Sequence, residues 1–600
     1  MKKQNILKRL EVVLGIALAL LLVYSIFLPK HIWAQVAEVI LIFVETGIIM
    51  FSADSKYNAF KVILIAILGL LLLSWVLPAA YYSGQYMDQG RVQMGLYSLF
   101  NYPLTSLSYF GFIATYVIFV GGFYGVLYKI PAYRTFLDKI VSAFKGKESV
   151  VLSIMIILIA AAVSVCGVQI AMIFFIPLFV SIILLMGYDK ITAALVIVGS
   201  TVAGLVGSTY AYGNIGMLLS SLSLDINYQI FVRVIILVVA IILVIINTLS
   251  YIKSNFSKKS VAEVVKKEVK TVTENVEKKV SKVASTSKKT TQNKKNSSKS
   301  KSSAKGSSKT TKNTTAKGSK TRKNNNKAAL KDNNVIVVKD AADVKSGYLV
   351  PEKENGKHTI WPFICGFILM FILVVMAFMP WGEGGFNLTI FKNATKAVLE
   401  FKVLKFPIFA KLYGTVNEFG AWTVTDLVLP MIILLLIIVL IYKVKFKDVL
   451  DGFVEGAKKS LAPALVSILI YTILVLVTYH PFQLVIYKYI LGMSKGFNIA
   501  TTIIVALLSS IFNGDVSYVF QSTLPYYASV VTNVDNYPVV GIIFQSMYGV
   551  AMLFAPTSLI LMGVLSYLKV SYKDWLKNIW KLLLELFIIL LIVFIIIALV

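Results

Sequence analysis

The 600-residue chain is poor in the residues that build covalent and metal-bound frameworks, with only two cysteines and three histidines. Cys166 and Cys365 lie within or beside apolar segments, which excludes a disulfide framework and a cysteine-based zinc site. His31, His358 and His480 are far apart in the sequence, which argues against a metal centre. No nucleophile, base and orienting residue form a recognisable set, so we expect neither an enzyme nor a bound cofactor.

Acidic residues are also scarce, because 29 Asp and Glu stand against 59 Lys and Arg. Segment 253–357 alone holds 28 basic and 9 acidic residues, so most of the excess charge is local. Such a stretch has too few apolar side chains to offset the entropy of ordering, which predicts a largely disordered cytoplasmic linker. Within it, valines from Val261 to Val283 recur every three or four residues and predict a short amphipathic helix near 259–283. Contact of this linker with anionic lipid stays open.

Apolar sequence, by contrast, is abundant: hydrophobic residues make up 58% of the chain, and the mean hydropathy is +0.79. Runs such as Val12–Leu28, Val62–Leu77 and Leu582–Val600 have the length of helices that cross a bilayer, which takes roughly 20 residues. These runs predict an all-α polytopic membrane protein. The first run follows four basic residues but lacks a small-residue cleavage site, so we interpret it as a retained span and not as a signal peptide.

The distribution of Lys and Arg predicts the orientation in a bacterial plasma membrane, with the N-terminus cytoplasmic and the C-terminus external. Residues 1–58 would form two additional N-terminal helices, 59–252 a first transporter repeat and 358–600 a second repeat. The uninterrupted spans are expected near 10–28, 32–52, 60–78, 111–128, 229–250, 359–380, 423–442, 461–480 and 576–600.

Each repeat also contains apolar segments that are broken by polar residues. Segments 150–187 and 498–532 predict re-entrant hairpins, and segments 190–224 and 538–568 predict discontinuous helices. The spacing matches: Gly167 to Pro177 is 10 residues and Gly514 to Pro525 is 11. One extra crossing in the second half makes the two repeats inverted, which is typical of secondary transporters. We therefore expect an inverted-repeat transporter fold.

The candidate site lies at the four breaks, since unwound backbone at membrane depth is tolerated only where it is buried in protein or lines a cavity. Helix N-termini suit a carboxylate, and carbonyl and hydroxyl oxygens suit Na⁺. The candidate substrate- and ion-binding residues are Gly167, Gln169, Gly207, Ser208, Thr209, Asn214, Asn513, Gly514, Asp515, Pro556, Thr557 and Ser558.

Each signal also has a purely structural interpretation. Ser and Thr in membrane helices often only bond their own backbone. Asp515 could bind a cation, carry a proton, pair with a substrate ammonium or reach external water. Arg233 could extend its side chain to the outer membrane surface. Gly121 and Gly125 form a GxxxG pattern that favours helix packing over ligand contact.

Seven sequence blocks resemble the anaerobic C4-dicarboxylate carrier-like family of the ion transporter superfamily, in particular its YfcC branch. The blocks are SWVLPAAYYSGQYMDQGR from Ser74, IFVGGFYGVLYK from Ile118, FKGKES from Phe144, MGYDKITAA from Met186, AGLVGSTYAYGNIG from Ala203, DGFVEGAKKSLAPAL from Asp451 and APTSLILMGVLSYLKVSYKDWLK from Ala555. The resemblance covers roughly residues 60–250 and 358–600, and it implies an elevator-type carrier of dicarboxylates, amino acids or related carboxylates.

The chain departs from this family at the expected site. Gly167-Val168-Gln169 stands where the family usually has acidic residues, and Tyr210-Ala211-Tyr212 replaces an expected proline. The Arg-Gly pair that commonly follows the EGAK helix is also replaced, around Tyr471-Thr472. The substrate therefore does not carry over from the family.

The leading hypothesis is an ion-coupled symporter or exchanger of a small carboxylate-bearing solute: an amino acid, a peptide-like metabolite or a dicarboxylate. The coupling ion, Na⁺ or H⁺, and a homodimeric state stay open. An alternative is a membrane tether whose basic linker binds ribosomes, nucleic acid or anionic lipid. A degenerate carrier that acts as a sensor is another.

Overall fold

The computed structural model describes residues 13–17, 19–20, 32–52, 58–255, 349–352, 358–382, 384–403, 405–414, 417–494 and 496–599. Most of the predicted span 10–28, the linker from 256 to 348 and the amphipathic helix predicted near 259–283 lie outside the described residues.

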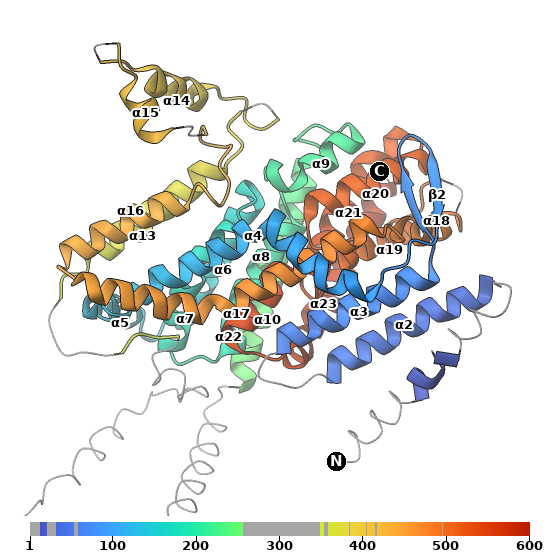
Figure 1. Cartoon of the computed structure of the whole chain (residues 1–600), viewed down its shortest axis with the longest axis horizontal. Coiled ribbons are helices and arrows are strands. Elements are labelled where there is room, and N and C mark those ends of the chain that lie inside the picture. The colour runs from blue at the N-terminus through green and yellow to red at the C-terminus, as the bar shows by residue number, and fades with distance from the viewer. Residues whose placement is uncertain are drawn as a thin grey trace, which may run out of the picture. The chain divides into compact units, whose positions relative to one another are not determined.

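The described residues are almost entirely helical, as the ribbon in Figure 1 shows. Eight of their helices are long and apolar enough to cross a membrane. These are α2 (Ile32–Ser52), α3 (Asn58–Val76), α4 (Leu96–Leu127), α6 (Glu148–Cys166), α10 (Ile230–Asn255), α13 (Trp361–Phe378), α17 (Phe446–Tyr479) and α23 (Tyr572–Leu599). The described part of the chain therefore has the all-α polytopic architecture that its composition predicts.

Helices α4 and α17 are longer than predicted, at 32 and 34 residues instead of the spans 111–128 and 461–480. Polar side chains lower the hydropathy of the first half of α4, but Thr105 and Ser108 bond carbonyls four residues back, so the helix continues. The two helices run antiparallel, with the Ser106 hydroxyl donating to the Ile468 carbonyl at 2.8 Å. Glycines allow the close approach: a Cβ on Gly125 would lie 2.1 Å from the Gly452 carbonyl oxygen.

The first predicted hairpin consists of α6, the 3₁₀ helix η1 (Ala171–Phe175) and α7 (Ile176–Leu185). The Tyr188 hydroxyl after α7 hydrogen-bonds the Ser149 side chain at the start of α6, so the two arms are antiparallel. The turn between them contains Gly167, whose φ of 70° lies in the left-handed region that suits glycine. The chain then continues into α8 (Lys190–Val206), which packs alongside α6.

The second predicted hairpin consists of α19 (Ile499–Phe512) and α20 (Val516–Val530). Its arms are also antiparallel, because Thr502 in α19 and Tyr527 in α20 share a hydroxyl–hydroxyl bond of 2.6 Å. The turn is short, and Asp515 caps α20 by accepting a hydrogen bond from the Tyr518 amide at 3.0 Å.

The two discontinuous helices are α8 with α9 (Tyr212–Leu222) and α21 (Tyr537–Met552) with α22 (Leu559–Leu568). The Ser546 hydroxyl and the Gln545 amide of α21 donate to the carbonyls of Val206 and Ser208, while α22 packs on α8. The two discontinuous helices therefore run antiparallel. Since each hairpin is bonded to the break of its own half, the hairpins point in opposite directions.

Several short elements were not predicted. Strands β1 (Ala79–Tyr82) and β2 (Tyr86–Gly90) pair antiparallel, with Tyr81 opposite Met87. Helix α5 (Pro131–Ala143) follows α4, and α18 (Gln483–Leu491) follows α17. Between α13 and α16 (Val428–Ile441) the chain forms α14 (Ile390–Glu400) and α15 (Ile408–Tyr413), and the 3₁₀ helix η2 (Val534–Asn536) precedes α21.

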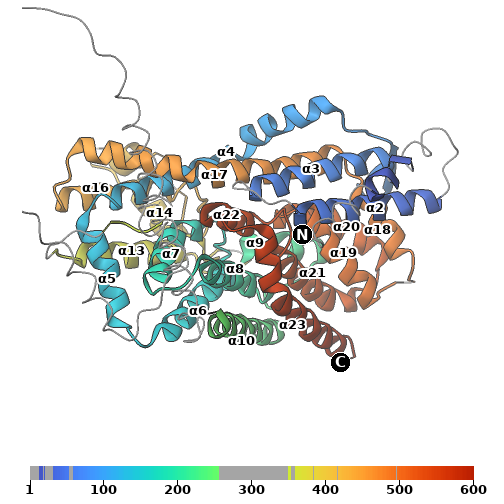
Figure 2. The ribbon, with the colours of Figure 1, turned by 90° about the horizontal axis from the view of Figure 1, so that it is seen from below.

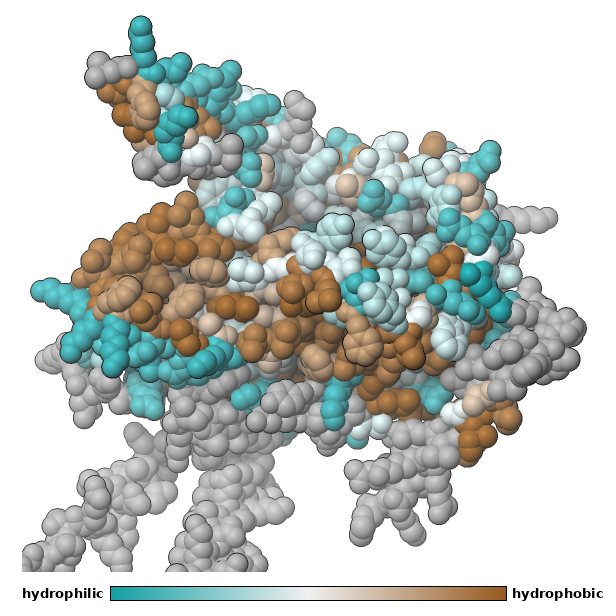
Figure 3. All heavy atoms as spheres, in the orientation of Figure 1, coloured by the Kyte–Doolittle hydropathy of each residue, from teal (hydrophilic) through white to brown (hydrophobic). Residues whose placement is uncertain are grey.

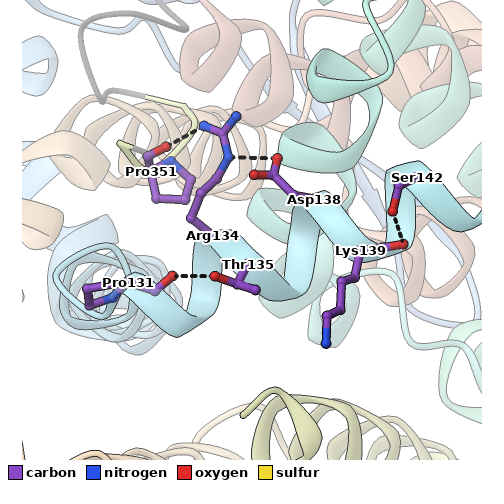
Figure 4. A network of polar contacts seen from close by, with 7 residues as sticks. All are labelled: Pro131, Arg134, Thr135, Asp138, Lys139, Ser142 and Pro351. Carbon is purple, nitrogen blue, oxygen red and sulfur yellow. Dashed lines mark hydrogen bonds and ion pairs between the residues drawn. The ribbon is translucent and has the colours of Figure 1, made fainter. Parts of the chain in front are cut away.

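The end of the expected linker is anchored to the helices of the first half. Leu349 and Val350 are completely buried, and the Leu349 carbonyl accepts hydrogen bonds from Tyr128 and Ser181 at 3.0 and 2.8 Å. Figure 4 shows Arg134 of α5 between Asp138 and Pro351, donating to the carboxylate at 2.9 Å and to the carbonyl at 2.7 Å. The predicted linker boundary at residue 357 is thus too late, because the apolar Leu349-Val350-Pro351 sequence binds the helical body.

Candidate functional site

A cavity of about 200 Å³ lies where the two hairpin tips meet the two helix breaks. Both halves of the chain contribute to its wall. Six of the twelve predicted site residues line it: Gly167, Gln169, Asn214, Gly514, Asp515 and Ser558. The other lining residues include Thr201, Tyr471, Ser517 and several apolar side chains.

Among the described residues that line this cavity, Asp515 has the one charged side chain. Its position follows from its role as the cap of α20, and its own amide donates to Asn513 Oδ1 at 2.9 Å. It lies close enough to Tyr471 and Tyr548 to interact with both phenols electrostatically. The carboxylate is therefore held at the N-terminus of a helix, where the helix dipole favours negative charge.

Asn214 contributes an amide from the first turn of α9. It is 7% exposed and packs against the first hairpin tip, since a Cβ on Gly167 would lie 3.1 Å from its Nδ2 atom. This Nδ2 group has no hydrogen-bond partner among the described residues. A buried donor that lines a cavity and lacks a protein partner is suited to bind an oxygen of a ligand.

Tyr548 of α21 holds the second hairpin tip. Its hydroxyl donates to the Gly514 carbonyl at 2.8 Å. Gly514 also lies against the second break, because a Cβ there would stand 2.1 Å from the Thr557 carbonyl oxygen. The second tip is thus joined to α21 by a hydrogen bond and packed against the second break through its backbone.

The other six predicted residues do not line the cavity. Gly207, Ser208 and Thr209 are buried behind it, where Ser164 of the first hairpin bonds the Gly207 carbonyl at 2.7 Å and the Thr209 hydroxyl at 3.1 Å. In the second half, Thr557 donates to the Ile511 carbonyl at 3.0 Å. Asn513 is buried at the tip, with its Oδ1 on the Asp515 amide, and Pro556 precedes Thr557 in the break. These residues fasten each break to its own hairpin.

Arg233 of α10 is wholly buried and does not extend to the membrane surface. Its guanidinium donates to the carbonyls of Ser208, Thr209, Ile226 and Tyr228 and stacks 4.3 Å from the Tyr228 ring centre. The amide of Gln545 reaches the same Ser208 carbonyl at 2.8 Å. The five donors of a guanidinium satisfy several unwound carbonyls at once. The interpretation that Arg233 extends to the outer surface is therefore wrong.

The second half has a matching arrangement without a charge. Trp575 is the fourth residue of α23, as Arg233 is of α10, and its indole donates to the Leu553 carbonyl at 2.9 Å. Tyr572 bonds the neighbouring Phe554 carbonyl. The roles of Arg233 and Trp575 were not predicted from the sequence, although each is the fourth residue of the helix that follows a break.

The chemistry of the cavity is that of a binding site. Asp515 offers a carboxylate to a cation or an ammonium group, and Asn214 offers an unpaired amide donor to a carboxylate. Gln169, Thr201, Tyr471 and Ser558 add neutral polar groups. In the described part of the chain, no lysine, arginine or histidine lines the cavity.

Comparison with known protein families identifies the family of the chain. The family described as "DcuC: C4-dicarboxylate anaerobic carrier" matches residues 38–295 and 338–599. No curated protein matches the chain. With apolar helices throughout and a family match on both halves, the protein is a multi-pass membrane transporter, and it belongs to the anaerobic C4-dicarboxylate carrier (DcuC) family.

Proposed function

We propose that the protein is an ion-coupled secondary carrier, a symporter or an exchanger, of a small solute that bears a carboxylate. The solute is an amino acid, a peptide-like metabolite or a dicarboxylate, and Na⁺ or H⁺ is the coupling ion. The cavity at the hairpin tips is the transport site in this proposal. The family match supports it for the class of protein, and the residues of the cavity support it for the site.

The observation that carries the proposal is that Asp515 and Asn214, from different halves of the chain, line one cavity. Asn214 Nδ2, without a partner among the described residues, is a donor for a substrate carboxylate. Asp515 is the group for the coupling cation, the proton or a substrate ammonium. An anchor or tether needs no such polar groups at membrane depth.

The antiparallel discontinuous helices support alternating access by an elevator-type movement, in which the hairpins carry the site past the remaining helices. In this proposal the N-terminus is cytoplasmic, the C-terminus is external, and the hairpins open to opposite faces of the membrane.

The test is uptake by proteoliposomes that contain the purified protein. Labelled amino acids and C4-dicarboxylates are presented with an inward Na⁺ gradient, an inward H⁺ gradient or neither. We expect gradient-driven accumulation of one solute class, and Asn214→Leu should raise the KM for it. Thermal stabilisation by a solute without any uptake would contradict transport and favour a sensor.

The tether alternative is tested by removing the linker. Because Leu349 and Val350 are buried, the deletion should span residues 258–345 and leave this anchored segment intact. Unchanged uptake after the deletion supports the carrier. Loss of the cellular role with uptake preserved would favour the tether.

A further inference from the structure

A second cavity, of about 590 Å³, lies apart from the transport site among α3, α17 and α22. Figure 2 shows α3 beside α17, with α22 next to α17, and the three helices pack on one another. The start of α3 is fixed at this place, because Asn58 Oδ1 accepts the Tyr572 amide at 2.7 Å. None of the twelve predicted site residues lines this groove.

Each of the three helices brings one lysine to the groove: Lys61, Lys458 and Lys569. All three are exposed residues, and no acidic side chain is among the described residues that line the groove. Three ammonium groups around one opening create a local positive potential that attracts an anion.

The rest of the groove is apolar, and it continues away from the lysines along each helix. Leu64 lies three residues from Lys61, and Leu461 and Leu465 lie three and seven residues from Lys458, so each set shares a helix face. Leu565 lies four residues before Lys569. Leu64, Leu461 and Leu465 are 38%, 49% and 43% exposed, so apolar side chains line the open part of the groove.

The polarity of the three helices is consistent. In α3 and α17 the lysine precedes the leucines, whereas in α22 it follows Leu565. The start of α22 packs near Tyr471 in the second half of α17, whereas Lys569 shares the groove with Lys458, so α22 runs opposite to α17. This order places the charges at one end of the groove and the hydrocarbon at the other. The orientation proposed above has this arrangement and puts the lysines at the cytoplasmic leaflet, where anionic lipids attract basic pockets between membrane helices.

We propose that this groove binds an anionic phospholipid. The phosphate would lie among Lys61, Lys458 and Lys569, and an acyl chain would lie along Leu64, Leu461 and Leu465. A small soluble anion would use the lysines but leave the apolar wall uncovered, which disfavours it as the occupant. The lipid would bridge α3 and α17 to α22, the helix whose N-cap residue, Ser558, lines the transport cavity.

The experiment is native mass spectrometry and thermal unfolding of the full-length protein in detergent, with phosphatidylglycerol or phosphatidylcholine added. We expect phosphatidylglycerol to be retained and to raise the midpoint of unfolding, and phosphatidylcholine to do neither. The variant Lys61→Gln/Lys458→Gln/Lys569→Gln should bind phosphatidylglycerol about 100-fold more weakly, since each lysine near an anionic surface contributes about fivefold.

Two further variants make the result specific. Lys443, Lys445 and Lys447 are exposed lysines at the start of α17 outside the groove, so their triple replacement by Gln is a control with the same charge change. It should retain the lipid. Ala462→Phe fills the groove without altering charge and should displace the lipid. This variant also tests the proposal if the triple lysine variant does not fold.

Three outcomes would overturn the proposal. The first is equal loss of lipid in the control and in the groove variant, which would indicate non-specific attraction to surface charge. The second is equal stabilisation by glycerol phosphate, which would indicate a soluble anion. The third is lipid binding that appears only after deletion of residues 258–345, which would indicate that the linker itself occupies the groove.

Discussion

Asp515 carries the only charge among the described residues that line the cavity at the hairpin tips, so its replacement tests the proposed site most directly. Asparagine caps helices about as well as aspartate, so Asp515→Asn should keep the bond to the Tyr518 amide and change stability little. We expect it to reduce net uptake at least tenfold relative to wild type, because loss of a charge-assisted contact costs about 1.5–3 kcal/mol. If Asp515 carries a proton, exchange would survive while the pH dependence disappears.

The measurement is uptake by proteoliposomes at equal amounts of folded protein. Asp535→Asn is the matched control, because Asp535 is an exposed carboxylate beyond the far end of the same hairpin. Wild-type uptake by Asp515→Asn would show that this carboxylate only caps α20 and does not take part in transport. Ser558→Thr should weaken the affinity for the solute less, because threonine retains the hydroxyl that caps α22.

Arg233 and Trp575 give a paired test of how the two breaks are held. Arg233→Met leaves the carbonyls of Thr209, Ile226 and Tyr228 without their side-chain donor, whereas Ser208 keeps the Gln545 amide, and each unpaired buried group costs about 1–3 kcal/mol. Trp575→Phe removes one hydrogen bond, to the Leu553 carbonyl, and should cost about 1 kcal/mol. Thermal unfolding in detergent should therefore show a much larger loss for Arg233→Met. Equal losses would mean that the guanidinium does not support the first break.

Some residues of the candidate site could be predicted from the sequence and others could not. Gly167, Asn214, Gly514 and Asp515 were predictable because they stand where polar residues interrupt apolar sequence, and because amide and carboxylate groups are rare at membrane depth. The roles of Arg233 and Trp575 were not, because their partners are backbone carbonyls and these leave no trace in the sequence. The same holds for Tyr548, which bonds the Gly514 carbonyl.

At the scale of elements, the contact of α4 with α17 depends on glycine. Gly125→Ala would place a Cβ 2.1 Å from the Gly452 carbonyl oxygen, and relief of such overpacking typically costs about 1–3 kcal/mol. Gly47→Ala is the control, because a Cβ there would meet nothing within 4 Å and alanine favours a helix. We expect a lower unfolding midpoint for Gly125→Ala only. Equal midpoints would show that the two helices are less closely packed than their backbones indicate.

The elements themselves were predictable to different degrees. The hairpins and the discontinuous helices occur where Gly, Pro and Ser-Thr interrupt apolar sequence, since these residues break helices at recognisable intervals. The full lengths of α4 and α17 were missed, because hydropathy finds the apolar half of a helix and not its polar extension. The strands β1 and β2 and the helices α14 and α15 lie in segments that connect apolar helices, so a search for membrane-spanning runs passes over them.

For the whole molecule, the direction of the hairpins decides the topology. In a background of Cys166→Ala and Cys365→Ala, single cysteines should be placed at the open ends of the hairpins. Asp189 is unsuitable, because it is 4% exposed, caps α8 and accepts a bond from Tyr251. Lys147 and Asp535 are exposed and replaceable. An impermeant maleimide should label Lys147→Cys from the cytoplasm and Asp535→Cys from outside, whereas labelling of both from one side would contradict the inverted arrangement.

The surface agrees with a membrane location of the helical body. Figure 3 shows hydrophobic side chains gathered over the region of α13, α16 and α17, with hydrophilic residues on either side of it. Exposed leucines and isoleucines such as Leu369, Leu436 and Ile437 belong to this region. In water such an apolar surface would promote aggregation, and in a bilayer it faces lipid.

Because segment 349–352 is anchored to the first half, the protein should tolerate division into two separate polypeptides within the linker. Since Leu349 and Val350 fasten the start of the second half to α5 and α7, covalent continuity through the linker is not what joins the halves. Two separately encoded polypeptides, 1–300 and 301–600, should therefore copurify through one affinity tag and reconstitute uptake together, while neither does so alone. Val350→Asp in the second polypeptide should weaken this pairing, and copurification that survives it undiminished would show that the remaining helix contacts are sufficient by themselves.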